Sequence, residues 1–155
     1  NPRDALHDEP YAAAFIVKTI LEMTGLVEGY SFWTFSDIFE ENYFPSVPFH
    51  GGFGLLNLYD IQKPTDRAFK LLHRRGTASL LADGLHATVD AWAIPQGNKL
   101  ILLLTNHALP CHSIFTETVR LRIAGSTEPP PVPLGRIDET PANPPKRRKK
   151  IKRPD

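Results

Sequence analysis

The sequence has only one cysteine and one methionine, and it has no long apolar run. Its 155 residues include one cysteine, Cys111, which excludes an internal disulfide framework, so nothing requires an oxidising compartment. No apolar run reaches the roughly 18 residues that a membrane-spanning helix needs, which predicts no membrane partner. Residues 1–4 show no signal peptide and no initiating Met. We therefore expect a chain that begins within a longer protein, and we favour a cytoplasmic location while the full-length protein's compartment stays unknown.

The histidines lack the spacing of a metal site. Six histidines are scattered along the chain, and only His107 and His112 lie close to the cysteine. A His-x₃-Cys-His grouping without further ligands does not make the four-ligand set of a zinc site. The sequence therefore predicts no metal and no cofactor.

The charges divide the chain into two unlike parts. Residues 1–127 hold 10 Lys and Arg against 13 Asp and Glu, a net of −3, whereas residues 128–155 hold 8 against 4, a net of +4. The second part also carries 8 of the 15 prolines. Such a segment buries too little apolar surface to offset its ordering entropy, so we expect residues 128–155 to form a disordered, Pro-rich basic tail. Nucleic-acid binding by residues 146–153 is the less favoured alternative, because no aromatic residue interleaves the basic run.

Two helices and a buried strand are predicted in the first half. Apolar residues recur at helical spacing over residues 11–23, with Asp8 as the expected cap and Gly25 as the stop. Residues 30–35 are aromatic and almost continuously apolar, which favours a strand buried on both faces. Pro64 begins a second helix over residues 64–75, with Gly76 as its C-cap. Its inward residues are expected to be Ala68, Phe69, Leu71 and Leu72.

The period of the pattern changes after Gly76. Residues 87–93 alternate small apolar residues with Thr88, Asp90 and Trp92, residues 95–98 resemble a turn, and residues 99–105 form a second strand. Residues 118–123 alternate in the same way. We expect antiparallel strands of a β-sandwich with one wet face. The predicted domains are 1–76, the end of a (β/α) barrel, 77–127, a partial sandwich, and 128–155, the tail.

Three motifs carry a resemblance to a known family. They are YSFWTFSDIFEE at 30–41, PFHGGFGLL at 48–56 and KPT at 63–65, with further matches at 68–73. Together they resemble glycoside hydrolase family 39, in which β-xylosidases are the nearest members and α-L-iduronidase is more distant. The resemblance covers residues 1 to about 125 and is strongest over residues 30–73.

The resemblance implies a fold and an activity. The family fold is a (β/α)8 TIM barrel with an attached β-sandwich, and a barrel alone needs roughly 250 residues. The chain would then hold only helix 7, strand 8 and helix 8, followed by an incomplete antiparallel β-sandwich. The implied activity is that of a retaining, exo-acting β-xylosidase, whose acid/base and nucleophile carboxylates would both precede Asn1. Adjacent Glu40 and Glu41 do not replace them, because the two carboxyls must flank the glycosidic bond from opposite faces.

The resemblance also names sugar-binding residues. Trp33 would form the floor of the sugar subsite, with a barrel-core aromatic as the alternative. Glu41 and Glu40 correspond to carboxylates that accept hydrogen bonds from sugar hydroxyls. Asp37 falls where iduronidases bind a uronic carboxylate, although an Asp at the start of a loop is more often a turn former. His50 would either line the pocket or organise its own loop.

Three functions follow for the chain. The first is an enzyme portion that contributes to a site for a β-xyloside or xylo-oligosaccharide but has no activity alone. The second is a non-catalytic carbohydrate-binding module built from the same residues. The third, nucleic-acid binding by the basic tail, is the least favoured. The sequence leaves the sugar, the linkage and homo-oligomerisation of the full-length protein open.

Overall fold

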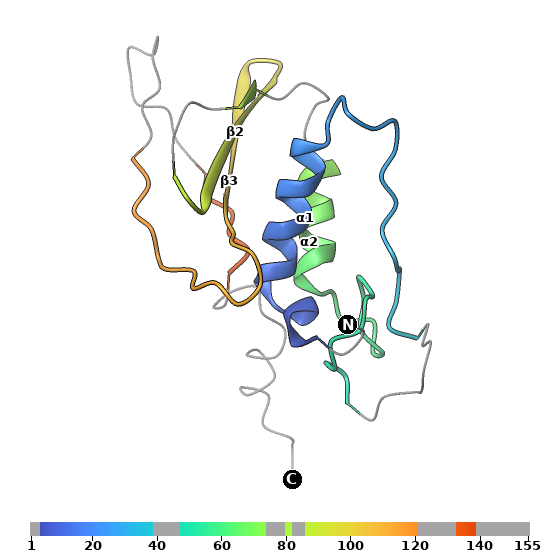
Figure 1. Ribbon diagram of the computed structural model, residues 1–155. Coiled ribbons are helices and arrows are strands. Elements are labelled where there is room, and N and C mark those ends of the chain that lie inside the picture. The colour runs from blue at the N-terminus through green and yellow to red at the C-terminus, as the bar shows by residue number, and fades with distance from the viewer. Residues whose placement is uncertain (1–3, 39–46, 74–79, 82–85, 121–132, 139–155) are drawn as a thin grey trace.

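Two helices pack side by side and a small antiparallel sheet lies against them (Figure 1). The computed structural model describes residues 4–38, 47–73, 80–81, 86–120 and 133–138. The elements are η1 (Ala5–Asp8), α1 (Pro10–Glu22), α2 (Pro64–His73), β1 (Leu80–Leu81), β2 (Val89–Gln96) and β3 (Lys99–Asn106). No helix among the described residues is both long and apolar enough to cross a membrane.

Helix α1 confirms the first predicted helix, but its cap differs. Pro10 occupies the first turn, where its missing N–H costs nothing, and the helix ends at Glu22, just before a turn in which Gly25 has a φ of 82°. Asp8 was expected to cap this helix and does not. The cap position is Glu9, which makes no side-chain cap bond, while Asp4 accepts from the Leu6 N–H to cap η1. Asp8 is buried instead, because its carboxylate has partners elsewhere in the fold.

Helix α2 packs along α1 and supplies part of the core. Ala68 is fully buried and Leu72 nearly so, which confirms two of the predicted inward residues, and Phe69 lies partly buried against the same core. Leu71 was also expected to point inward and is 37% exposed. Leu71 therefore lies outside the buried residues of α2, which are Pro64, Thr65, Ala68 and Leu72.

Strands β2 and β3 form the predicted hairpin, but its turn is shorter than predicted, because Pro95 and Gln96 belong to β2. They pair antiparallel from Val89↔Asn106 to Gln96↔Lys99, around Gly97, whose φ of 60° suits a tight two-residue turn. The buried face, however, carries Trp92 and Ile94 rather than the small residues that alternate with them. Trp92 has a far larger apolar surface than the small residues on the other face, so burying Trp92 removes more apolar surface from water.

The third expected strand does not form over its described part. Residues 118–120 belong to no strand and are exposed, and residues 121–123 lie outside the described residues. The third position of the sheet is taken by β1, which pairs with β2 through Leu80↔Ala93 and Leu81↔Trp92.

Residues 30–35 also differ from the prediction, because they form no regular strand and are not buried on both faces. Tyr30, Trp33 and Phe35 are 45%, 56% and 70% exposed. A strand needs hydrogen-bonded neighbours along its length, and a strand inside a parallel sheet has one on each side. Among the described residues, this segment makes backbone hydrogen bonds only with residues 53–56, so no ladder is completed.

One core joins the helices to the hairpin. Trp92 packs in the same cluster as Ile16 and Val17 of α1 and Leu72 of α2. At the edge of this cluster, Lys18 Nζ lies 2.6 Å from a carboxylate oxygen of Asp90. Burial lowers the pKa of Lys18, but the hydrogen bonds to its carboxylate partners outweigh burial and raise that pKa overall.

The expected disordered tail falls mostly on residues outside those described. Residues 133–138 are the exception: they form neither helix nor strand. Within them, Ile137 packs against the core cluster. One apolar side chain from the region assigned to the tail is therefore used in packing.

His107 lies just after β3 with one ring nitrogen buried and unpaired. It is 8% exposed, its ring centroid is 4.8 Å from that of Tyr11 and 5.7 Å from that of Phe15, and its Nε2 has no hydrogen-bond partner. Burial lowers the pKa of His107 below its ordinary value of about 6.5, and the positive charge of Lys18 lowers it further.

This histidine is expected to make stability fall on mild acidification. Because the folded-state pKa lies below the unfolded one, its contribution is fully present above about pH 6.5 and is lost as the pH falls through the folded-state pKa. Between pH 7.5 and pH 5, urea midpoints should fall more for the wild type than for His107→Phe. An equal fall in both proteins would contradict this, and His73→Phe, at an exposed histidine at the end of α2, is the control.

Candidate functional site

Trp33 projects from a segment that is fixed on both sides of it. The ring of Phe32 meets the ring of Phe69 on α2 edge-on, with the centroids 5.3 Å apart. The Thr34 N–H donates to the Phe53 carbonyl at 3.2 Å, and the Leu55 N–H donates to the Thr34 carbonyl at 3.0 Å. Trp33 itself is 56% exposed. The Trp33–Thr34 peptide bond is cis.

The glycine-rich loop, residues 50–56, runs beside this segment with no room for side chains at two positions. A Cβ on Gly52 would lie 2.5 Å from Asp37 Oδ1 and 2.8 Å from His50 Nε2. A Cβ on Gly54 would lie 2.3 Å from the Asp37 backbone nitrogen. Gly54 is needed because two stretches of backbone approach closely, and Gly52 because a Cβ would meet the side chains of Asp37 and His50. The loop therefore sits in direct contact with the residues that follow Trp33.

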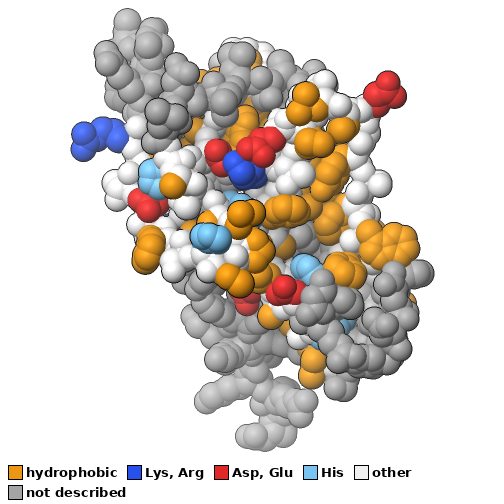
Figure 2. Space-filling model, in the orientation of Figure 1, with side chains coloured by type: hydrophobic (Ala, Val, Ile, Leu, Met, Phe, Trp, Pro, Cys, Tyr) orange, Lys and Arg blue, Asp and Glu red, His pale blue; other side chains and the backbone are white. Residues whose placement is uncertain are grey.

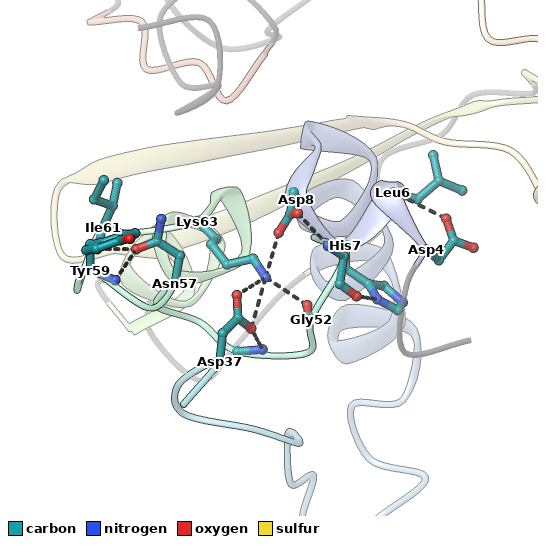
Figure 3. Close-up of polar contacts among 12 residues, drawn as sticks. Asp4, Leu6, His7, Asp8, Asp37, Gly52, Asn57, Tyr59, Ile61 and Lys63 are labelled. Atoms are coloured by element: carbon teal, nitrogen blue, oxygen red, sulfur yellow. Dashed lines mark hydrogen bonds and ion pairs between the residues drawn. The ribbon is translucent and has the colours of Figure 1, made fainter. Parts of the chain in front are cut away.

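A buried ammonium group lies at the centre of this contact (Figure 3). The Lys63 side chain has no exposed surface, and its Nζ lies 3.0 Å and 3.2 Å from the two carboxylate oxygens of Asp37. It donates to the Gly52 carbonyl at 2.7 Å. It also lies 2.6 Å from Asp8 Oδ1, as an ion pair. We call these three side chains, Asp8, Asp37 and Lys63, the lysine cluster.

Backbone groups of the glycine-rich loop complete the lysine cluster. The Gly54 N–H donates to Asp37 Oδ1 at 2.7 Å, and the Gly51 N–H donates to Asp8 Oδ2 at 2.7 Å. His7 also contacts this loop. Its Nδ1 lies 2.7 Å from the Gly51 carbonyl oxygen, and its ring centroid is 4.8 Å from that of Phe53. The carboxylates of Asp8 and Asp37 and the ammonium of Lys63 are thus all paired with groups inside the protein.

The structure separates the predicted sugar-binding residues by exposure. Trp33 is exposed and His50 is half-buried beside Gly52. Asp37 is 1% exposed and bonded to Lys63 and Gly54, which favours the loop-forming alternative for this residue over contact with a sugar. Glu40 and Glu41 lie outside the described residues.

Sequence reasoning did not single out Lys63, Asp8 or His7 as parts of this arrangement. Lys63 stands in a matched motif, but the motif does not show that its ammonium is fully buried. Its partners lie 26 residues away at Asp37 and further still at Asp8, so no local spacing reveals the cluster. Within the described ranges, no group of three His, Cys, Asp or Glu is placed to hold a metal ion.

Gly54→Ala should destabilise the protein by about 1–3 kcal/mol, the usual cost of forcing extra atoms into a packed region. The added methyl would meet the backbone at Asp37 and Ser36, and backbone cannot rotate aside as a side chain can. Gly29→Ala is the matched control, because nothing lies within 4 Å of its Cβ, and its change should stay within about 0.5 kcal/mol. Equal urea midpoints for the two variants would contradict this prediction, because they would show that the loop backbone shifts to make room for the methyl group.

The sequence model of glycosyl hydrolases family 39 matches residues 1–155, the whole chain. The chain belongs to this family. A β-xylosidase of Caldicellulosiruptor saccharolyticus is 44% identical over 147 residues, 93% of this chain and 30% of that protein. A β-xylosidase of Geobacillus stearothermophilus is 43% identical over 84 residues, 54% of this chain and 17% of that protein.

Solved structures of the family are similar too. The crystal structure of the GH39 enzyme from Xanthomonas axonopodis pv. citri shows 39% identity and a TM-score of 0.48, covering 61% of this chain and 20% of that one. The chain spans about a third or less of the length of these relatives.

Proposed function

We propose that the chain is the C-terminal portion of a retaining glycoside hydrolase that hydrolyses β-xylosides, with exo action on xylo-oligosaccharides. The 44% identity with a β-xylosidase over 93% of the chain carries this proposal. In the full protein the chain would contribute the end of a (β/α)8 barrel and part of a β-sandwich. Its own contribution to the reaction is sugar binding, since the acid/base and the nucleophile belong to the portion before Asn1.

Trp33 is the residue through which we propose that the chain meets the sugar. An indole is a flat apolar surface against which the C–H groups of a pyranose can pack. The segment is fixed before and after Trp33, and Trp33 is 56% exposed, so the platform is held in place while much of its surface stays accessible. Glu41 and Glu40 would accept hydrogen bonds from hydroxyls of the same ring, and His50 would line the pocket from the glycine-rich loop.

A non-catalytic carbohydrate-binding module is the second candidate. The same exposed indole favours it, because a stacking platform binds sugar whether or not a reaction follows. The two proposals differ in what the remainder of the protein must supply. A retaining glycosidase needs two carboxyl groups about 5–5.5 Å apart across the glycosidic bond.

The chain alone should show no turnover of an aryl β-xyloside, whereas the full-length protein should release the aglycone. A general acid and a nucleophile together supply most of the rate, and neither is proposed to lie in this chain. Release of nitrophenol from nitrophenyl β-xyloside by homogeneous samples of each protein measures this. Turnover by the chain alone would contradict the proposal that the acid/base and the nucleophile lie outside it. Xylose binding without any turnover by the full-length protein would favour the binding module.

A further inference from the structure

The lysine cluster ties together three stretches that are distant in sequence. Lys63 contacts Asp8 next to α1, Asp37 after the Trp33 segment, and the Gly52 carbonyl of the glycine-rich loop (Figure 3). Each contact is 3.2 Å or shorter. One ammonium therefore fixes the mutual positions of all three stretches.

This arrangement reaches Trp33 through backbone hydrogen bonds. Asp37 Oδ1 holds the Gly54 N–H, and the adjoining Phe53 carbonyl accepts from the Thr34 N–H. The Asp37 N–H in turn donates to the Leu56 carbonyl at 2.9 Å. The backbone from Thr34 to Asp37 is thus clamped against residues 53–56, and Trp33 lies immediately before the clamp.

Stability alone does not account for three buried charges. Taking an ammonium and two carboxylates out of water is costly, and buried ion pairs often give no more stability than apolar residues of the same volume. The cluster does supply defined geometry, because charged hydrogen bonds are short and directional, whereas an apolar contact tolerates sliding. An exposed platform that must meet a sugar ring at a fixed position gains from such support.

We propose that the Lys63–Asp37 pair is a positioning device for the Trp33 platform, with Lys63 and Asp37 acting as positioning residues that do not touch the sugar. The inference rests on the proposed function, because it assigns a role to residues behind the proposed sugar-binding surface. It does not depend on the identity of the leaving group, since the effect acts through the ring that stacks on Trp33.

The proposal is tested by the Michaelis constant of the full-length protein rather than by its specific activity. A change that only destabilises the fold lowers the amount of active enzyme and so the apparent kcat, but it leaves the KM of the remaining enzyme unchanged. Displacement of a binding platform raises KM, because binding in both the ground state and the transition state is lost. The inhibition constant for free xylose reports on the same platform without any chemical step.

The variants are Asp37→Asn, which keeps the side chain's shape, and Lys63→Met, which removes the ammonium. Their matched controls are Asp66→Asn and Lys70→Met, which alter a salt bridge on the surface of α2. Asp37→Asn should raise the KM for nitrophenyl β-xyloside and the xylose inhibition constant together, by roughly 2- to 10-fold, the range expected when one stacking contact is weakened. The controls should leave both constants unchanged. If Lys63→Met does not fold, Asp37→Asn alone decides the test.

The outcomes separate this inference from the proposed function. If the wild-type protein hydrolyses the xyloside and Asp37→Asn has the wild-type KM and xylose inhibition constant, the positioning role is wrong and the function stands. If the wild-type full-length protein neither hydrolyses the xyloside nor is affected by xylose, the proposed function fails and the positioning role falls with it. A joint rise in both constants, absent from Asp66→Asn, supports the positioning role.

Discussion

Lys63→Met is expected to lower the free energy of unfolding by about 3–5 kcal/mol. The substitution keeps most of the apolar stem of the side chain but leaves the Asp8 and Asp37 carboxylates buried without their cation. Both side chains are almost completely inaccessible to water, so solvent does not replace the lost partner. Urea unfolding followed by the fluorescence of buried Trp92 measures the change.

Two further variants make this stability prediction specific. Lys70→Met removes an exposed helix lysine whose partner is Asp66, and a surface pair of this kind contributes about 0.3–0.5 kcal/mol. Combining Lys63→Met with Asp8→Asn and Asp37→Asn removes all three charges and should recover most of the loss. If the triple variant is no more stable than Lys63→Met, the loss comes from packing and the charge argument is wrong.

Trp33→Ala and Glu41→Ala in the full-length protein are expected to damage catalysis rather than folding. Losing a hydrogen bond to a charged group costs about 1.5–3 kcal/mol. If the bond from Glu41 is fully expressed in the transition state, kcat/KM falls roughly 10- to 150-fold. Trp33→Ala should also lower kcat/KM, because the sugar loses its stacking surface. Initial rates on nitrophenyl β-xyloside measure both effects.

The denaturant midpoint of the same variants separates site from core. A core tryptophan would cost about 3–5 kcal/mol on truncation, whereas Trp33 is 56% exposed and should cost much less. Trp92 provides the contrast, since it is 4% exposed and belongs to the core cluster. A collapsed midpoint in Trp33→Ala would assign that residue to the core, and unchanged kinetics in Glu41→Ala would remove Glu41 from the site.

Local patterns in the sequence were enough to predict the helices and the hairpin. The apolar period of α1, Pro64 at the start of α2 and the Gly97–Asn98 turn each act within a few residues. Such signals do not depend on what the rest of the chain does. The family was also recognisable from short motifs, because YSFWTFSDIFEE and PFHGGFGLL keep their order and spacing wherever they lie in space.

Other features depended on partners that local sequence does not contain. The buried face of β2 was decided by the surface that α1 and α2 offer to Trp92 rather than by the alternation of small residues. Residues 30–35 have strand-like composition, but a strand also needs neighbours to accept and donate its hydrogen bonds. Composition alone therefore predicted an element that the described residues do not complete.

The lysine cluster shows this limit most clearly. From the sequence, Asp8 is a reasonable helix cap, Asp37 a turn former or sugar ligand, and Lys63 one residue of a short motif with no assigned partner. Tertiary structure brings them together across 26 residues and more and buries all three. Charges removed from water must find each other, and which ones meet is decided by the packing of the whole chain. The sequence by itself determined the helices, the hairpin and the family, and only the tertiary structure decided what holds Trp33 in place.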